Sequence, residues 1–272
     1  MRIAQFTRTS NTVASFSMLL CVSTCALAEE ADAPQGWSGT LGAGVASTAT
    51  YEGSPRRRTT GVPILTLAYY DKSFGTFELG RQGLSWTMPD LDGFKAGVLL
   101  GLDAGRKDSK VSGGGFASGD ERLRGMGDIK ATPEVGLLVG YGPIGLTVRK
   151  SIGDKGHQGT QADLEARFPI KLTDALSLSI GAGATWADQK YMQAFFGVTS
   201  AQATASRFKR VFKPDSGIKK AEFTFGVEYN FTESWRAQTS IGVDTLLSEA
   251  RKSPLAEKKS ATTGFVGIAY SF

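Results

Sequence analysis

The chain has 272 residues, with 34 glycines, two cysteines and one histidine. One histidine cannot build a multi-histidine metal site, and two cysteines cannot build a four-cysteine zinc site or a disulfide scaffold. The formal net charge of +5 is modest and hydrophobic residues make up 41%, so composition alone is typical of an ordinary soluble protein.

The N-terminus, however, is typical of a secretory signal peptide. Two arginines precede an apolar stretch at 13–28, and Ala26-Leu27-Ala28 offers a cleavage site. Both cysteines fall inside this segment. We predict that residues 1–28 are a signal peptide and that residues 29–272 form one exported, cysteine-free domain. The exported part has no apolar run long enough for a spanning helix, so any membrane residence must use strands.

Apolar residues alternate with small or polar residues along most of the exported chain. In one segment Phe223, Phe225 and Val227 alternate with Thr224 and Gly226. Successive side chains of a strand point to opposite faces, so each such segment has one apolar face. Many segments reach about 10 residues, the length that a tilted strand needs to cross a bilayer. The predicted strands are 36–49, 61–71, 74–81, 83–89, 93–104, 129–141, 143–152, 159–170, 175–187, 219–231, 234–247 and 260–272, of which the third and fourth are short.

The connections between these segments alternate in length. The longer, polar ones are 50–60, 105–128, 153–158, 188–218 and 248–259. Short periplasmic turns and long external loops are typical of bacterial outer-membrane barrels, and an even strand number leaves both chain ends in the periplasm. The fold class predicted is therefore an all-β, antiparallel transmembrane barrel of about 12 strands. The alternative is a periplasmic β-sandwich.

The last segment carries a further signal. Val266, Ile268, Tyr270 and Phe272 form its apolar face, and Phe272 is the final residue. This pattern resembles the signal that the barrel assembly machinery of the outer membrane reads.

Alternation also places charges of both signs on the inner face. An interior bridged by salt links and an open pore with a mild cation preference both fit this pattern. The residues concerned are Lys95, Arg149, Arg167, Arg236, Asp103, Glu134, Asp163, Glu165, Glu222, Glu228 and Asp244.

Two groups in the external loops could carry chemistry. His157 could act as the base of a hydrolase, but no serine motif marks a nucleophile for it, and we expect a solvated side chain and no catalysis. Arg56, Arg57 and Arg58 could bind lipopolysaccharide phosphates or be simply solvated. Nucleic-acid binding is not expected of an exported barrel, and no cofactor is expected either.

The segment 188–218 is unusually rich in aromatic residues for an external loop, with Tyr191, Phe195, Phe196, Phe208 and Phe212. It could fold inward as a plug or present a surface to a partner. We favour either of these over a bare solvated loop.

Several loop segments resemble the MipA/OmpV family of outer-membrane proteins. The most specific is 187–198, which contains Asp188, Tyr191, Phe195, Phe196, Gly197 and Val198. The weaker ones are Tyr51-Glu52-Gly53-Ser54, Gly125-Met126-Gly127-Asp128-Ile129, His157 with Gly159, and Ser253-Pro254. They follow in the family's order and span essentially the whole exported chain.

The resemblance implies a non-enzymatic outer-membrane barrel, and outer-membrane lipid and lipopolysaccharide are the surroundings expected of such a barrel. It also implies a scaffold that bridges a lytic transglycosylase and a penicillin-binding murein synthase. Porin-like channels and surface adhesins are alternatives within the same family. No catalytic residue is carried over.

Overall fold

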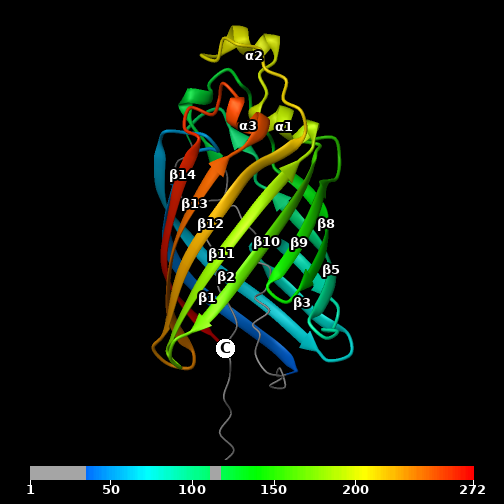
Figure 1. Cartoon of the computed structure of the whole chain (residues 1–272), viewed down its shortest axis with the longest axis vertical. Helices are drawn as coiled ribbons and strands as arrows, with labels where there is room; N and C mark the ends of the chain where they lie inside the picture. The colour runs from blue at the N-terminus through cyan, green and yellow to red at the C-terminus, as the bar shows by residue number, and fades with distance from the viewer. Residues whose placement is uncertain (1–34, 111–117) are drawn as a thin grey trace, which may run out of the picture.

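The computed structural model describes residues 35–110 and 118–272; the predicted signal peptide lies outside the described residues. Within them, twelve antiparallel strands form one closed barrel (Figure 1). No helix here is long and apolar enough to span a membrane. The barrel strands are β1 (Gly36–Ala49), β2 (Arg57–Asp71), β3 (Gly75–Gly80), β4 (Gly83–Thr87), β5 (Phe94–Asp103), β8 (Thr132–Tyr141), β9 (Ile144–Ser151), β10 (Thr160–Lys171), β11 (Leu176–Ala187), β12 (Gly217–Asn230), β13 (Trp235–Leu246) and β14 (Ser260–Ser271). The predicted fold class and strand number are confirmed.

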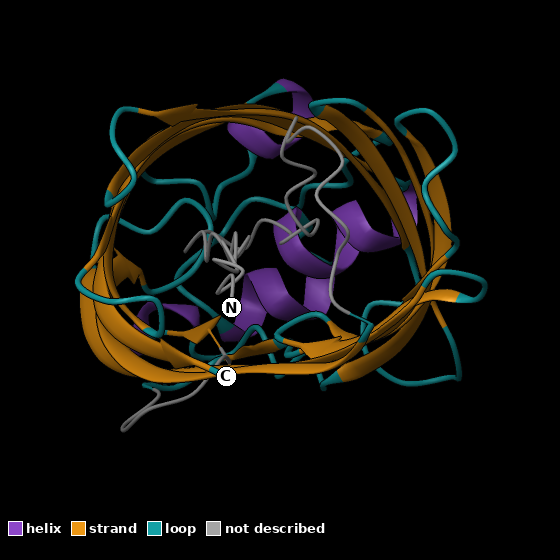
Figure 2. Cartoon of the chain, turned by 90° about the horizontal axis from the view of Figure 1, so that it is seen from below, coloured by secondary structure: helices purple, strands orange, loops and turns teal. Residues whose placement is uncertain are grey.

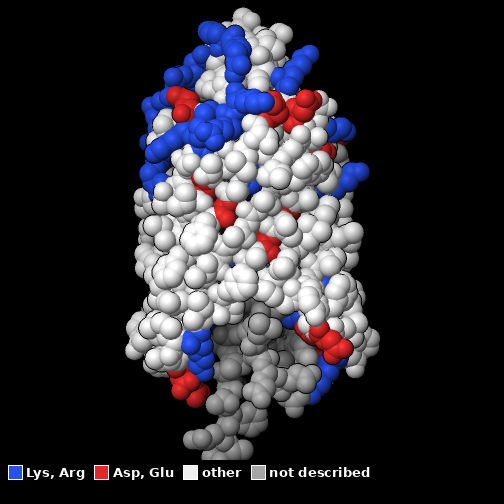
Figure 3. Space-filling model, viewed as in Figure 1, with Lys and Arg blue, Asp and Glu red and all other residues white. Residues whose placement is uncertain are grey.

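The alternation of the sequence becomes an inside and an outside. On β5 the side chains of Val98 and Leu100 are exposed on the outer surface, whereas Leu99 and Asp103 are buried inside. On the face drawn in Figure 3 the same pattern makes the middle of the barrel mostly uncharged, with a few acidic atoms visible there, and most charges gather at its two ends. An apolar outer band of this kind suits contact with lipid.

Aromatic side chains ring the outer surface at the end with the short turns. Trp37 and Tyr69 lie 5.1 Å apart between ring centroids, and Trp235 and Tyr270 lie 5.2 Å apart. Aromatic girdles of this kind mark the level of a membrane–water interface.

The first and last strands close the barrel. β1 pairs with β14 from Thr40 opposite Ser271 upward, and Gly39 exchanges two backbone hydrogen bonds with Phe272, at 2.9 and 3.0 Å. The outer face of β14 is the predicted one, with Val266, Ile268 and the terminal aromatic residues exposed.

The hairpin of β3 and β4 is short, as predicted, and makes one side of the wall low. β3 reaches only Leu67 on β2, so β2 above this residue has β1 as its strand partner among the described elements. Pro63 lies in this upper part of β2. A proline has no N–H to donate, and it is tolerated in a strand where a ladder bond is not required.

The long and short connections alternate as predicted, but two details differ. β2 begins at Arg57, so Arg57 and Arg58 belong to a strand and not to the predicted loop 50–60; the ladder continues upward because Ala49 pairs with Arg57. The long loops also contain elements that the strand pattern does not predict. They are a small parallel sheet of β6 (Arg106–Lys107) and β7 (Ser118–Gly119), the 3-10 turn η1 (Glu121–Leu123), and the helices α1 (Gln189–Phe196), α2 (Ser200–Ala205) and α3 (Ser248–Lys252).

Candidate functional site: the loop layer that closes the barrel

The long loops pack together over one end of the barrel. We call this layer the plug and define it as the described residues of 50–56, 104–131, 152–159, 188–216 and 247–259. Figure 1 shows α1 and α3 at this end, and the view from below shows helices lying across the barrel interior (Figure 2). Two apolar clusters hold the layer together. One contains Ala187, Tyr191, Met192, Phe195, Phe196, Leu246, Ala250 and Ala256; the other contains Tyr51, Leu123, Met126, Val198, Ala203, Phe208 and Leu255.

Helix α1 is the centre of the plug. The Asp188 side chain accepts a hydrogen bond from the Tyr191 amide at 2.9 Å, which caps the N-terminus of the helix, and the helix ends before Gly197. Tyr191 and Phe196 are completely buried. The aromatic segment therefore folds inward, and of the two predicted alternatives the structure adopts the plug.

The other segments of the family resemblance lie in the same layer as this helix. Tyr51 and Met126 lie in the second apolar cluster, and burial raises the pKa of Tyr51 to about 12. Val198 pairs with Phe212 through two backbone hydrogen bonds, and Gly53 packs against Ala256 of the first apolar cluster. Segments far apart in the sequence thus meet in one layer.

Within the second of the weaker segments, Gly125 is half-buried, and Gly127 and Asp128 are exposed. Gly125 and Gly127 adopt positive φ angles of 86° and 77°, which place the loop's turns there. Asp128 forms an exposed ion pair with Lys107, 2.7 Å long. These residues shape the loop and make no site of their own.

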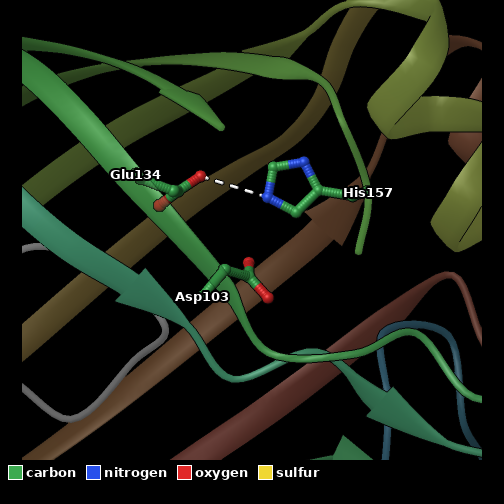
Figure 4. A group of neighbouring side chains, drawn as sticks. All are labelled: Asp103, Glu134 and His157. Carbon is green, nitrogen blue, oxygen red and sulfur yellow. Dashed lines mark ion pairs between the residues drawn. The ribbon is translucent and has the colours of Figure 1, made fainter. Parts of the chain in front are cut away.

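His157 is buried directly below α1, and the expectation of a solvated side chain is wrong. The ring packs edge-on against Tyr191, 4.9 Å between centroids, and is only 2% exposed. Its Nε2 lies 3.2 Å from Oε1 of Glu134 on β8, without the alignment of a full hydrogen bond, and Asp103 on β5 lies nearby (Figure 4). The packing of α1 from a different loop buries the imidazole.

Gly159 explains how the helix comes so close to this loop. A Cβ atom at Gly159 would lie 2.4 Å from the backbone nitrogen of Tyr191. Any larger residue would push α1 away from His157. The pairing of His157 with Gly159 in the resemblance therefore has a packing reason.

The cluster of Asp103, Glu134 and His157 offers one imidazole and two carboxylates within 4.8 Å, which is a donor set that divalent metals use. The Gly159 amide, however, donates a hydrogen bond to Nδ1 of His157 at 3.1 Å. A neutral imidazole that accepts at Nδ1 carries its proton on Nε2, the atom facing Glu134. As folded, Nε2 therefore has no lone pair for a metal.

The same geometry bears on hydrolysis. Within the described residues the polar contacts of the imidazole are with Gly159 and Glu134, and neither supplies a hydroxyl nucleophile. A nucleophile must lie within hydrogen-bond reach of its base. The arrangement suits an anchor for the plug.

Charged side chains join the plug to the inner wall. Arg149 bridges Glu134 and Asp163 at 3.2 and 2.9 Å, and Lys219 reaches Glu52 of the plug at 3.2 Å. Burial alone would raise the pKa of the Glu52 carboxyl, but the ammonium groups of Lys219 and Lys220 hold it below its usual value. The predicted interior of salt-linked charges is confirmed here and at Arg236, 3.6 Å from Glu228.

Arg106 fixes the C-terminal end of α1. Its guanidinium donates hydrogen bonds to the carbonyl oxygens of Phe195 and Ala194 and lies 5.8 Å from the ring centroid of Phe195. Burial lowers the pKa of Arg106 to about 10. A buried cation at a helix C-terminus complements the partial negative charge there.

The predicted lipopolysaccharide residues lie at the extracellular end of the barrel, Arg56 in the plug and Arg57 and Arg58 at the start of β2. Arg56 pairs with Asp120 at 3.3 Å, Arg57 donates to Ser47, and Arg58 is half-buried. Basic side chains gather at this end of the molecule (Figure 3). The three arginines therefore do not converge on one pocket, although Arg56 and Arg57 remain exposed.

A closed twelve-stranded barrel with an apolar outer band, an aromatic girdle and long loops at one end is an outer-membrane β-barrel. Its long-loop end is extracellular and its short-turn end is periplasmic. The family model described as MltA-interacting protein MipA matches residues 41–272, and the chain belongs to this family.

One curated relative and two solved structures illustrate the similarity. The chain is 25% identical over 230 residues to the 24 kDa outer membrane protein of Pasteurella multocida (strain Pm70), which covers 80% of this chain and 84% of that protein. The translocator domain of autotransporter NalP from Neisseria meningitidis matches with a TM-score of 0.40 and 12% identity, over 89% of this chain and 90% of that one. A loop-deletion mutant of OmpT from Vibrio cholerae matches with a TM-score of 0.39 and 11% identity, over 87% and 98%.

Proposed function

We propose that this chain is a non-enzymatic scaffold of the outer membrane, which binds a murein-degrading lytic transglycosylase and a penicillin-binding murein synthase on its periplasmic side. The observation that supports this proposal best is the plug. The segments that carry the family resemblance lie in the plug at the extracellular end, where Tyr191 and Phe196 are completely buried. The periplasmic turns are then the accessible protein surface on the side where murein lies.

Apolar side chains on these turns support a protein contact. Leu91 is 58% exposed in the turn after β4, and Leu172 is 53% exposed in the turn after β10. Charged neighbours such as Asp90 and Asp174 surround them. An apolar centre with a polar rim is the usual anatomy of a protein interface.

The test is recovery of the two enzymes with the tagged chain from detergent extracts of outer membranes. We expect both enzymes with the unchanged chain, and several-fold less of them after Leu91→Ser combined with Leu172→Ser. Val211→Ser is the matched control, because Val211 is a comparably exposed apolar residue at the opposite end. Failure to recover either enzyme with the unchanged chain would refute the scaffold function.

The interaction with the barrel assembly machinery and with lipopolysaccharide belongs to the same proposal. The exposed apolar face of β14, ending at Phe272, supports the first, and the exposed Arg56 and Arg57 support the second. Replacement of Phe272 by Ala is expected to lower the amount of folded barrel in the membrane. Replacement of both arginines by Gln is expected to leave folding intact and to lower retention on immobilised lipopolysaccharide.

A further inference from the structure

The barrel interior below the plug contains a cavity of about 340 Å³. Its lining includes the periplasmic turns at 88–90 and 142–143, and the inner faces of β8 and β10. Ligand pockets in proteins measure from about 300 Å³ upward and combine apolar walls with a few placed polar groups. The volume and position therefore suit a small solute that enters from the periplasm.

Four side chains that line this cavity have buried polar atoms without a hydrogen-bond partner in the described part of the chain. They are Oε1 of Glu165, Nη1 of Arg167, Nε2 of Gln82 and Oγ1 of Thr147. Glu165 is only 8% exposed. Buried polar atoms in native proteins are nearly always paired, so four unpaired ones around a single cavity favour an occupant with complementary groups.

The chemistry of these atoms defines the occupant. Glu165 and Arg167 stand two residues apart on β10 and therefore point to the same, inner side. A carboxylate accepts hydrogen bonds from an ammonium group, and a guanidinium donates to a carboxylate. Leu138, Met88 and Pro143 add apolar side chains to the lining of the cavity.

We propose that this cavity binds a small zwitterionic solute, whose ammonium group lies on Glu165 and whose carboxylate lies on Arg167. The Gln82 amide donates a further hydrogen bond from the short hairpin across the cavity. The cavity is separate from the plug and from the exposed turn residues Leu91 and Leu172, so the site does not depend on the scaffold function.

Calorimetry on the full, folded chain in detergent tests the site with three probes of nearly equal size. Alanyl-alanine has both charges, N-acetyl-alanyl-alanine has only the carboxylate, and alanyl-alanine amide has only the ammonium group. We expect the dipeptide to bind and each blocked form to bind about tenfold more weakly, since each has lost one charge-assisted contact. Equal affinity of all three probes, or no binding of the dipeptide, would overturn the proposal.

Two variants assign each contact. Glu165→Gln is expected to weaken binding of the dipeptide and of the amide form but not of the N-acetyl form. Arg167→Gln is expected to weaken binding of the dipeptide and of the N-acetyl form but not of the amide form. Glu228→Gln is the matched control, because Glu228 is another buried, inward carboxyl, 3.6 Å from its partner Arg236 and outside the cavity lining. If Glu228→Gln lowered the affinity for the dipeptide as much as Glu165→Gln does, the proposed site would be contradicted. If a variant fails to fold, the comparison of probes on the unchanged chain decides alone.

Discussion

His157 and Glu134 meet 3.2 Å apart beneath α1, one from a loop and the other from a strand of the barrel wall. Arg149 lies on the other side of the same carboxylate and links it to Asp163. The only histidine of the chain thus connects the aromatic centre of the plug to a charged network inside the barrel. This connection explains how the loops stay closed over an interior that is largely polar.

Replacing His157 by Ala is expected to loosen the plug. The change leaves a gap below Tyr191 and removes one neighbour of a buried carboxylate, so the free energy of plug opening should fall by about 2–4 kcal/mol. Cleavage of the loop 188–216 by added protease in intact outer membranes measures this opening. Lys155→Ala, an exposed change in the same loop, is the control. Equal cleavage rates in both variants would contradict the anchoring role of the imidazole.

Acid is expected to weaken the plug through Glu52. The pKa of its carboxyl is lowered in the folded chain. Its ion pair with Lys219 therefore stabilises the folded state fully at any pH above the ordinary carboxyl pKa of 4.5. This stabilisation is lost as the pH falls through the lowered pKa. Glu52→Gln should flatten the acid side of the curve of unfolding temperature against pH and reduce stability at pH 7, where Lys219 then lacks its anion.

The control for this pH series is Glu249→Gln, which removes an acid paired with Lys252 in α3. It should keep the acid sensitivity of the unchanged chain. An unchanged slope in Glu52→Gln would show that the Glu52 ion pair does not cause the sensitivity.

The strands were predictable because lipid on one side and a packed interior on the other impose alternation at every strand. The start of β2 was not predictable from this alternation. Arg57 pairs with Ala49 above the apolar band, where lipid does not impose an alternating pattern. Helix α1 did have a local signal that the strand pattern obscured. Tyr191, Met192, Phe195 and Phe196 recur at helical spacing after Asp188, a good N-cap residue.

The burial of His157 had no local signal. Its neighbours in sequence are polar residues and glycines, typical of an exposed loop. The residues that cover it, Tyr191 and Phe195, come from a different loop and reach it only in the closed barrel. The inner cavity is equally non-local, since β4, β8 and β10 all contribute to it.

Metal ions are expected to leave stability unchanged, because Nε2 of His157 carries a proton and faces Glu134. Thermal unfolding in the presence of a chelator or of added zinc should give the same midpoint. A bound ion would raise the midpoint with its concentration. A zinc-dependent rise that disappears in His157→Ala would show that the cluster with Asp103 is a metal site after all.

The seam between β1 and β14 is expected to tolerate no side chain at Gly42. A Cβ there would lie 2.3 Å from the backbone oxygen of Ile268, whereas a Cβ at Gly61 on β2 would meet no atom within 4 Å. Gly42→Ala should therefore reduce the fraction of chain that migrates as a folded barrel in unheated gels. Gly61→Ala should leave that fraction unchanged, and equal losses in both variants would contradict this account of the seam.

Under the proposed function the plug closes the extracellular end, and the protein acts through contacts and not by conduction. Single-channel recording in planar bilayers tests it most directly, with the unchanged chain beside a variant in which residues 189–205 are replaced by a short Gly-Ser linker. The account predicts no conductance steps for the unchanged chain and clear steps for the variant, in which both α1 and α2 are gone. Steps of the same size in both proteins would contradict the claim and favour a porin-like channel.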